Sequence, residues 1–191
     1  MGDDKLIDEP ETRGIIHSIR TNEVIWFLVK AAGMLLAWYL VYEFVLNPTE
    51  IIDLPMIKHL IWASSLFLSL FGYHVIDRVF EDMRTMGIDG TNGVWIGDAC
   101  NGITLFAVFA IIIIALPGPV KTKLWYIPMG ILVIHLSNII RITALSIIVF
   151  YKPDILEFNH NYTFQLIEYT IMFLLWIRWV NKYSGLSLKR V

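Results

Sequence analysis

The chain has 191 residues, of which 57% are hydrophobic and only 17% are charged, and its mean hydropathy is +0.63. Soluble domains are more charged and less apolar, so this composition indicates an integral membrane protein with several helices. The formal net charge of −2 does not favour a nucleic-acid partner. The single cysteine, Cys100, excludes an internal disulfide, a cysteine-based zinc site and a Cys-x-x-Cys redox pair.

Apolar segments along the chain predict an all-α membrane protein. The four segments expected to span are residues 24–46, 101–116, 124–150 and 163–180. A fifth segment, residues 60–73, has an uncharged stretch shorter than the roughly 20 residues that a spanning helix needs. It is bracketed by Lys58, His59 and His74, which favours an interfacial or re-entrant helix, although snorkelling of the flanking charges would still allow it to span.

The polar stretch before Cys100 contains two tight-turn signals, Asp89-Gly90 and Asn92-Gly93, followed by the strand-like residues 94–96. This pattern predicts a small β-hairpin that leads directly into Cys100. The N-terminal residues 1–23 mix acidic and basic side chains without an apolar core, so we expect a cytoplasmic segment and not a signal peptide.

Basic residues near span ends indicate the orientation, because cytoplasmic loops are enriched in lysine and arginine. If all three basic groups are cytoplasmic, the chain has four spans, and residues 60–73 lie at the outer face. The alternative has five spans and an outer N-terminus, which places the basic residues near Arg20 on the unfavoured side. The three groups are Arg13, Arg20 and Lys30; Lys121 and Lys123; and Lys182, Lys189 and Arg190.

This topology brings Cys100, Arg141 and His160 into the outer half of the membrane. Cys100 follows a glycine-rich loop at a predicted helix start, where backbone N–H groups and the helix dipole favour a thiolate. An arginine within a span costs about 3 kcal/mol of insertion free energy, so we expect Arg141 to have a specific functional or structural role. The alternatives are structural: Cys100 as a small packing residue, Arg141 in a salt bridge that joins two helices, and His160 as a solvated loop side chain.

Further polar residues surround these three in the predicted arrangement. Asn138 lies one turn before Arg141 on the same face, so we expect it to orient the guanidinium. Glu168 lies at a similar depth to Arg141, and we expect the two charges to pair, directly or through Asn138 or a water. Asp98 would either tune the thiol or cap a helix, Asn101 would support the cysteine, and His135 is expected to pack or to form a hydrogen bond.

Three short motifs carry a resemblance to a known family: Cys-Asn-Gly-Ile at residues 100–103, Ser-Asn-Ile-Ile-Arg-Ile at 137–142, and Asn-His at 159–160. Together they resemble the exosortase/archaeosortase family of integral-membrane cysteine transpeptidases. The resemblance implies that Cys100, Arg141 and His160 are catalytic, with the histidine typical of the bacterial exosortase branch. The short chain, with Asn101 where the family often has serine, is similar to compact exosortase-like proteins of Bacteroidetes.

The resemblance also implies a function and a location. The protein would cleave a C-terminal sorting signal of exported client proteins through a thioester and would pass the client to a lipid or glycan amine, or to water, without a metal or organic cofactor. It would lie in the bacterial inner membrane with its active site facing the periplasm. Residues 1–23 would be cytoplasmic, residues 24–180 would form the catalytic domain, and residues 181–191 would form a basic cytoplasmic tail.

Two functions of other classes fit the same residues. In a membrane assembly partner without catalytic activity, Arg141 and Glu168 would only hold helices together. In a small transporter or channel subunit, Glu168, Arg141 and His135 would line a polar path. Replacing Cys100 by alanine separates the alternatives, because it should abolish the activity of an enzyme and leave the other two functions nearly intact.

Overall fold

The computed structural model describes residues 9–76 and 84–185, with side chains described from residue 24 onward. The first eight residues and the last six, which include Lys189 and Arg190 of the predicted tail, lie outside the described residues. The described chain is mostly helical, as its composition predicts. The long helices are α1 (Glu9–Val41), α3 (Asp53–Leu70), α5 (Ile103–Ala115), α6 (Val120–Tyr151) and α8 (Phe164–Lys182).

Short elements connect these helices and shape one end of the molecule. Strand β1 (Thr85–Met86) pairs antiparallel with β2 (Val94–Trp95), just before Cys100, where the sequence predicts a hairpin. The connection before α8 consists of short helical elements. The short helical elements are η1 (Tyr42–Leu46), α2 (Asn47–Thr49), η2 (Asp98–Cys100), η3 (Pro153–Ile155), α7 (Leu156–Phe158) and η4 (Asn159–Thr163).

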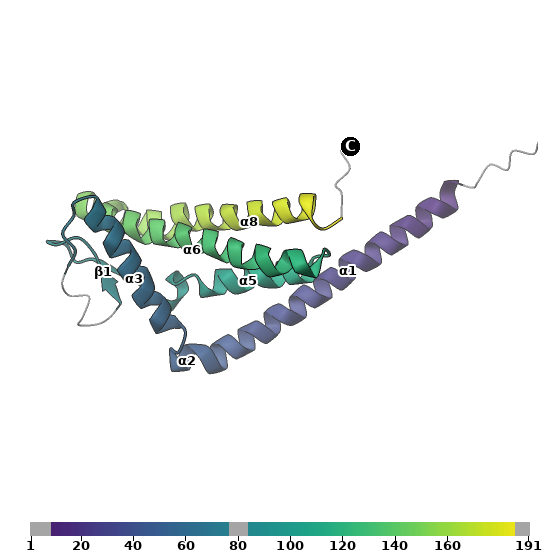
Figure 1. Cartoon of the computed structure of the whole chain (residues 1–191), viewed down its shortest axis with the longest axis horizontal. Helices are drawn as coiled ribbons and strands as arrows, with labels where there is room; N and C mark the ends of the chain where they lie inside the picture. The colour runs from purple at the N-terminus through teal and green to yellow at the C-terminus, as the bar shows by residue number, and fades with distance from the viewer. Residues whose placement is uncertain (1–8, 77–83, 186–191) are drawn as a thin grey trace, which may run out of the picture.

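Helices α5, α6 and α8 lie side by side, with α6 running opposite to the other two (Figure 1). Helix α1 packs obliquely against α5, and α3 leans across the end of the bundle where α6 ends and α8 begins. Close approach of α5 and α6 depends on Gly130, since a Cβ at that position would lie 2.2 Å from the Phe109 ring. The strands, η2 and α7 lie at the same end of the bundle as α3.

Two of the described helices are long and apolar enough to cross a membrane, Val24–Thr49 and α6. The apolar helix α5 has only 13 residues, and α8 carries Glu168 and Arg178 within its 19 residues. The outer surfaces of the helices expose large apolar side chains, as contact with lipid requires. Examples are Trp26, Leu36, Leu132, Ile140, Leu166 and Phe173.

The buried core has two main parts. One part lies where α3 and the strands meet α6, and half-buried Cys100 packs against it. The other part fills the half of the α5–α6–α8 bundle that lies away from α3, and it includes Phe109, Tyr126 and Trp179. The rings of Tyr126, Trp179 and Tyr183 contact one another in tilted and edge-to-face arrangements, and Lys182 lies 5.3 Å from the Tyr183 ring.

Candidate active site

Cys100 ends the short 3₁₀ turn η2, immediately before α5. Its backbone N–H donates a hydrogen bond to the Gly97 carbonyl, at 2.9 Å, and its side chain is half-buried. The Cys100 Sγ lies 3.3 Å from Nε2 of His160, although 60 positions separate the two residues in the chain. The structure therefore brings together a thiol and an imidazole at hydrogen-bond distance, which is the basic arrangement of a cysteine nucleophile with its general base.

His160 lies in the π-helical turn η4, which continues directly into α8. Its Nδ1 lies 3.0 Å from Oδ1 of Asn161, the next residue in the chain. An amide oxygen only accepts hydrogen bonds, so Nδ1 carries the hydrogen and Nε2 presents its lone pair to the thiol. Sequence analysis missed Asn161, because a residue adjacent to His160 produces no spacing pattern that would single it out.

The start of α5 explains the Cys-Asn-Gly motif. Asn101 is fully buried, and its Oδ1 accepts a hydrogen bond from the Ile103 backbone N–H at 2.8 Å, which satisfies one of the free donors at the helix start. Gly102 has a φ of +85°, a left-handed conformation that favours glycine. A Cβ at Gly102 would also lie 3.2 Å from Asn138 Nδ2. The motif therefore allows α6 to approach the cysteine closely.

Asn138 has a different partner from the one expected. Its Nδ2 donates a hydrogen bond to the Cys100 backbone carbonyl at 2.9 Å, and no hydrogen bond between Asn138 and Arg141 is found among the described residues. The expectation that Asn138 orients the guanidinium is thus wrong. Spacing along α6 placed the two residues on one face, but Asn138 points to the turn that carries Cys100, so it fixes the position of the cysteine backbone relative to α6.

The predicted contact between Arg141 and Glu168 is confirmed. Arg141 Nη1 donates to Glu168 Oε2 at 2.9 Å, and both residues are only 4% exposed. The pair joins α6 to α8 inside the bundle. The guanidinium is therefore engaged by the carboxylate, and among the described contacts no hydrogen bond links it to Cys100. Arg141 affects the thiol through its charge at a distance.

The electrostatic environment of Cys100 contains two opposing effects. Burial raises the pKa of the Cys100 thiol above its ordinary value, and the positive charge of Arg141 lowers it by a smaller amount. The negative charge of Glu168 raises it slightly. The net direction of the pKa is upward, because removal of the sulfur from water outweighs the charge of Arg141 and the backbone hydrogen bond with Gly97.

A raised thiol pKa has a measurable consequence for alkylation. Because only the thiolate reacts, we expect the iodoacetamide rate of Cys100 to rise with pH through a midpoint above about 8.5, the value of an unperturbed thiol. Arg141→Gln should move the midpoint further upward, since it removes the charge that favours the thiolate. Labelling followed by mass spectrometry across pH 6–10 measures both midpoints. A midpoint below that of free cysteine would contradict the environment described.

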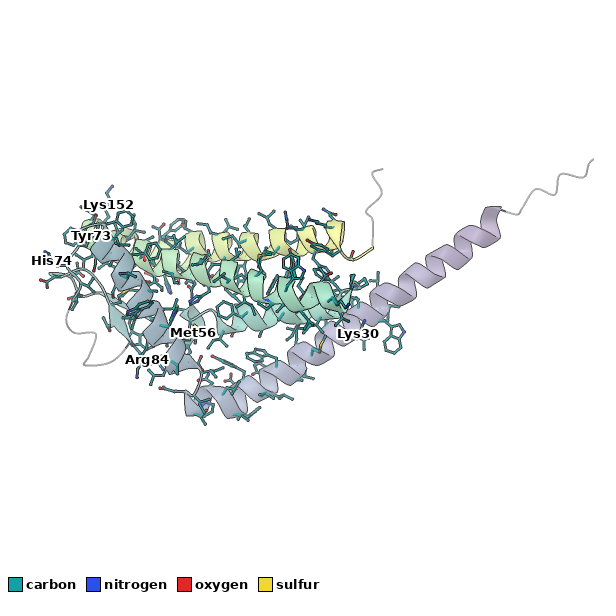
Figure 2. The ribbon with its side chains drawn as sticks, in the orientation of Figure 1. Lys30, Met56, Tyr73, His74, Arg84 and Lys152 are labelled. Atoms are coloured by element: carbon teal, nitrogen blue, oxygen red, sulfur yellow. The ribbon has the colours of Figure 1, made fainter. Side chains whose placement is uncertain are left out.

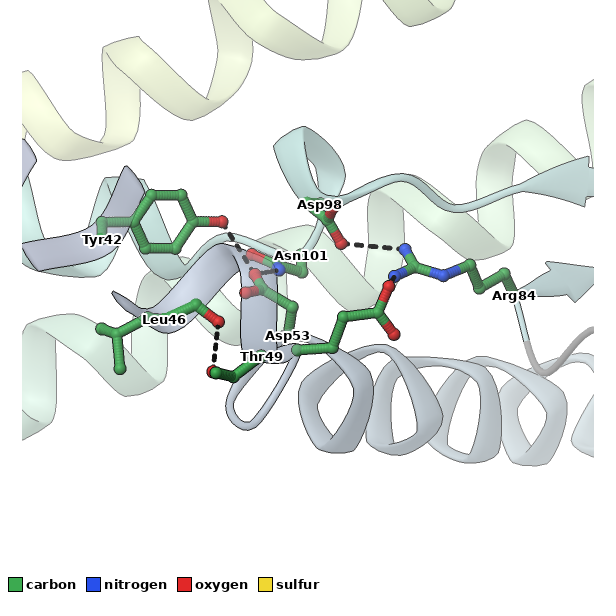
Figure 3. Close-up of polar contacts among 8 residues, drawn as sticks. Tyr42, Leu46, Thr49, Asp53, Arg84, Asp98 and Asn101 are labelled. Carbon is green, nitrogen blue, oxygen red and sulfur yellow. Dashed lines mark hydrogen bonds and ion pairs between the residues drawn. The ribbon is translucent and has the colours of Figure 1, made fainter. Parts of the chain in front are cut away.

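Asp98 does not cap a helix and pairs instead with Arg84. Its Oδ1 accepts from Arg84 Nη1 at 2.8 Å, and Arg84 Nη2 also reaches Glu50 Oε1 at 2.9 Å (Figure 3). The turn η2 has no side-chain cap, since its N-cap residue is Gly97. Asp98 thus attaches the turn that carries Cys100 to the strand region and to the loop before α3. The charge of Arg84, which sequence analysis missed, lies between two carboxylates.

A second contact network ties the cysteine turn to α1 and α3. Asp53, the first residue of α3, is fully buried and accepts hydrogen bonds from Tyr42 Oη, at 2.8 Å, and from Asn101 Nδ2 (Figure 3). Asn101 in turn holds the start of α5. Asp53 is thus a positioning residue for the Cys100 turn. Sequence analysis assigned it no role, because an aspartate before a predicted helix is usually a solvated cap.

Removal of Asp53 should loosen this turn. We expect Asp53→Ala to lower the free energy of unfolding by about 2–3 kcal/mol, because the buried amide of Asn101 and the hydroxyl of Tyr42 lose their acceptor. The matched control is Asp98→Ala, which breaks a partly exposed ion pair and should cost less than about 1 kcal/mol. Thermal unfolding in detergent compares the two variants. Equal losses would indicate that the Asp53 network does not hold the turn.

His135 forms the hydrogen-bonding contact expected of it. Its Nε2 lies 3.1 Å from Nδ1 of His59 on α3, and the described hydrogen bonds do not link it to Arg141 or Glu168. Within residues 9–76 and 84–185, no group of three or more histidine, cysteine, aspartate or glutamate side chains is placed to hold a metal ion.

Comparison with known proteins identifies the family of the chain. The chain matches the family model described as Transmembrane exosortase (Exosortase_EpsH) over residues 14–177, a range that includes Cys100, Arg141 and His160. No curated protein and no solved structure matches the chain significantly. The family match covers most of the chain and both halves of the thiol–imidazole pair. The chain therefore belongs to the transmembrane exosortase family.

Proposed function

We propose that this exosortase is a membrane-embedded cysteine transpeptidase or protease that cleaves a C-terminal sorting signal of exported client proteins. The observation that carries the proposal is the 3.3 Å contact between Cys100 Sγ and His160 Nε2. Asn161 completes the order thiol, imidazole, amide that papain-like cysteine proteases use on an unrelated fold. The family match supports the same chemistry.

The proposed reaction follows from these contacts. His160 Nε2 accepts the thiol proton while Cys100 Sγ attacks the scissile carbonyl. The C–N bond then breaks, and His160 returns the proton to the leaving amine, which releases the C-terminal helix of the client and leaves a thioester on Cys100. An amine on a lipid or glycan carrier, or water, resolves the thioester. The charge of Arg141 stabilises the thiolate, and the positive end of α5, which begins at Ile103, favours negative charge near Cys100.

The same proposal assigns the membrane arrangement. Helices α1, α5, α6 and α8 are the four spans, and α3 is the helix at the outer face. The start of α6, with Lys121 and Lys123, and the end of α8, with Lys182, lie at one end of the bundle beside the buried rings of Tyr126 and Trp179. Figure 2 places Lys30 toward that end and Tyr73 at the other. Positive residues are enriched on the cytoplasmic side, so the site faces the periplasm from the inner membrane.

Within this arrangement, residues 24–180 are the catalytic domain, and residues 1–23 and 181–191 are its cytoplasmic flanks. Helix α1 already begins at Glu9, so the N-terminal flank continues directly into the first span. The partners are the client's sorting signal, a lipid or glycan acceptor and the surrounding membrane lipids.

Trapping of the acyl-enzyme tests the proposed chemistry. The enzyme is co-expressed with a secreted protein from a neighbouring gene that ends in a short motif, an apolar helix and a basic tail. We expect mass spectrometry to find a client segment attached to Cys100 through a bond that hydroxylamine cleaves, as a thioester requires. Processing of the client with attachment at a different residue would contradict the assignment of Cys100 as the nucleophile.

A further inference from the structure

A pocket lies directly beside the thiol–imidazole pair, on the side of His160. Its volume is about 280 Å³, and it is lined by Gly93, Val94, Trp95, Leu156, Glu157 and His160. The lining therefore comes from β2 and its turn on one side and from α7 and η4 on the other. Cys100 is not part of the lining, so a group in this pocket would reach the sulfur past the imidazole of His160.

The position of His160 indicates at which step of the reaction this pocket would be used. A general acid that protonates the leaving amine must lie on the leaving-group side of the scissile bond. By microscopic reversibility, an acceptor amine that attacks the thioester enters through the same place and gives its proton to the same imidazole. Because His160 lines the pocket, the pocket lies on the side where one amine leaves and the next one arrives.

The charge of the pocket is set by Glu157. This side chain is exposed, and the described residues offer it no hydrogen-bond or ion-pair partner. The cation on the β2 side, Arg84, lies 5.8 Å from the Trp95 ring and is paired with Asp98 and Glu50. Its charge is therefore largely compensated. A carboxylate beside an exposed indole ring favours a positively charged guest, through an ion pair and through cation–π attraction.

We infer that this pocket binds the acceptor and that the acceptor is a cationic amine. The inference rests on the proposed function and specifies the nucleophile that resolves the thioester, which is an amine and not water. Glu157 attracts the ammonium form to the pocket beside His160. One proton passes to solvent to give the free amine, and His160 Nε2 takes a second proton from the nitrogen as it attacks. The N–C bond to the acyl group forms, the S–C bond breaks, and the proton passes to Cys100 Sγ. The client leaves as an amide, and the thiol is restored.

The first test uses the single thiol as a reporter and requires no catalysis. Cys100 in the detergent-solubilised protein is modified with a cationic reagent, 2-(trimethylammonio)ethyl methanethiosulfonate, or with the anionic 2-sulfonatoethyl methanethiosulfonate. Each rate is divided by the rate of free cysteine. We expect the cationic reagent to be preferred by about tenfold, from the attraction of one partly screened carboxylate, and Glu157→Gln should remove that preference.

The matched control is Asp154→Asn, which removes an exposed carboxylate from η3 that does not line the pocket and should leave the preference in place. Preference for the anionic reagent would show that Arg141 dominates the approach to the sulfur, and it would overturn the inference. An identical ratio in Glu157→Gln and the unmodified sequence would overturn it as well. So would the absence of reaction with both reagents, because the pocket would then not open onto Cys100.

The second test concerns the acceptor itself. Cys100 is acetylated with p-nitrophenyl acetate, and release of the acetyl group is followed with ethylenediamine, which carries a second, charged amine, or with 2-methoxyethylamine, which does not. After correction for the rates with a free thioester, we expect the diamine to be favoured about fivefold, and Glu157→Gln to abolish this preference. Equal corrected rates would overturn the assignment of a cationic acceptor. Failure of acetylation at Cys100 would count against the proposed nucleophile, while the first test still decides the pocket.

Discussion

Replacing Cys100 with alanine is expected to abolish client processing, with a loss of about 10⁴-fold or more, because the group that forms the covalent bond is absent. Stability should change little. The side chain is half-buried, and only its sulfur is removed, so we expect the free energy of unfolding to fall by about 1 kcal/mol or less. Immunoblots of the client in cells give the first quantity, and thermal unfolding of the purified variant gives the second.

The control for this substitution is Cys100→Ser, which keeps the size and a hydrogen bond to His160 but provides a much weaker nucleophile. It should be as inactive as the alanine variant. An unchanged function in both variants would favour an assembly partner or a transporter subunit, in which Cys100 only packs. A loss of function that accompanies unfolding in Cys100→Ala alone, with full activity in Cys100→Ser, would point to a structural role.

The second large effect concerns the buried ion pair between α6 and α8. We expect Glu168→Gln to lower the free energy of unfolding by about 3–5 kcal/mol, because the Arg141 charge is 4% exposed and loses its counter-ion. Client processing should fall as well, since a displaced guanidinium no longer stabilises the Cys100 thiolate. Unfolding in detergent and processing in cells measure the two losses.

A double variant separates the two contributions of this pair. In Arg141→Leu/Glu168→Leu both charges are replaced by apolar side chains, and such replacements are often neutral or stabilising. We therefore expect stability to recover while processing stays low, because the positive charge that opposes the effect of burial on Cys100 is gone. Recovery of processing together with stability would show that the pair only joins the helices and does not act on the thiol.

Much of this arrangement follows from hydropathy and charge. The order of the helices can be predicted from the sequence. Cys100 and His160 then converge at one end of the bundle because α6 runs opposite to α5 and α8. The contact between Arg141 and Glu168 was also predictable, because two opposite charges at similar depth in an apolar medium have a strong reason to meet.

The partners of the remaining polar residues were not predictable in the same way. Asn138 contacts the Cys100 carbonyl and not Arg141. Asp53 accepts hydrogen bonds from Asn101 and Tyr42, which belong to two other parts of the chain. These contacts depend on how each helix is rotated about its axis and on where α3 crosses the bundle. Periodicity along a single helix determines which residues share a face, but it does not determine what that face meets.

The length of α5 links the site to the thickness of the bilayer. Its 13 residues rise about 1.5 Å each, which gives an axis of about 20 Å, whereas the hydrocarbon layer is about 30 Å thick. At its far end, Lys123 Nζ donates to the carbonyls of Ile114 and Leu116 at 2.8 and 2.6 Å, so a charge is drawn inward there. In the proposed arrangement, in which α5 spans the membrane, this mismatch is met by local thinning of the membrane or by an immersed Cys100 end. With an immersed end, a client has to bring its scissile peptide below the headgroups, and lipids with shorter chains should ease that descent.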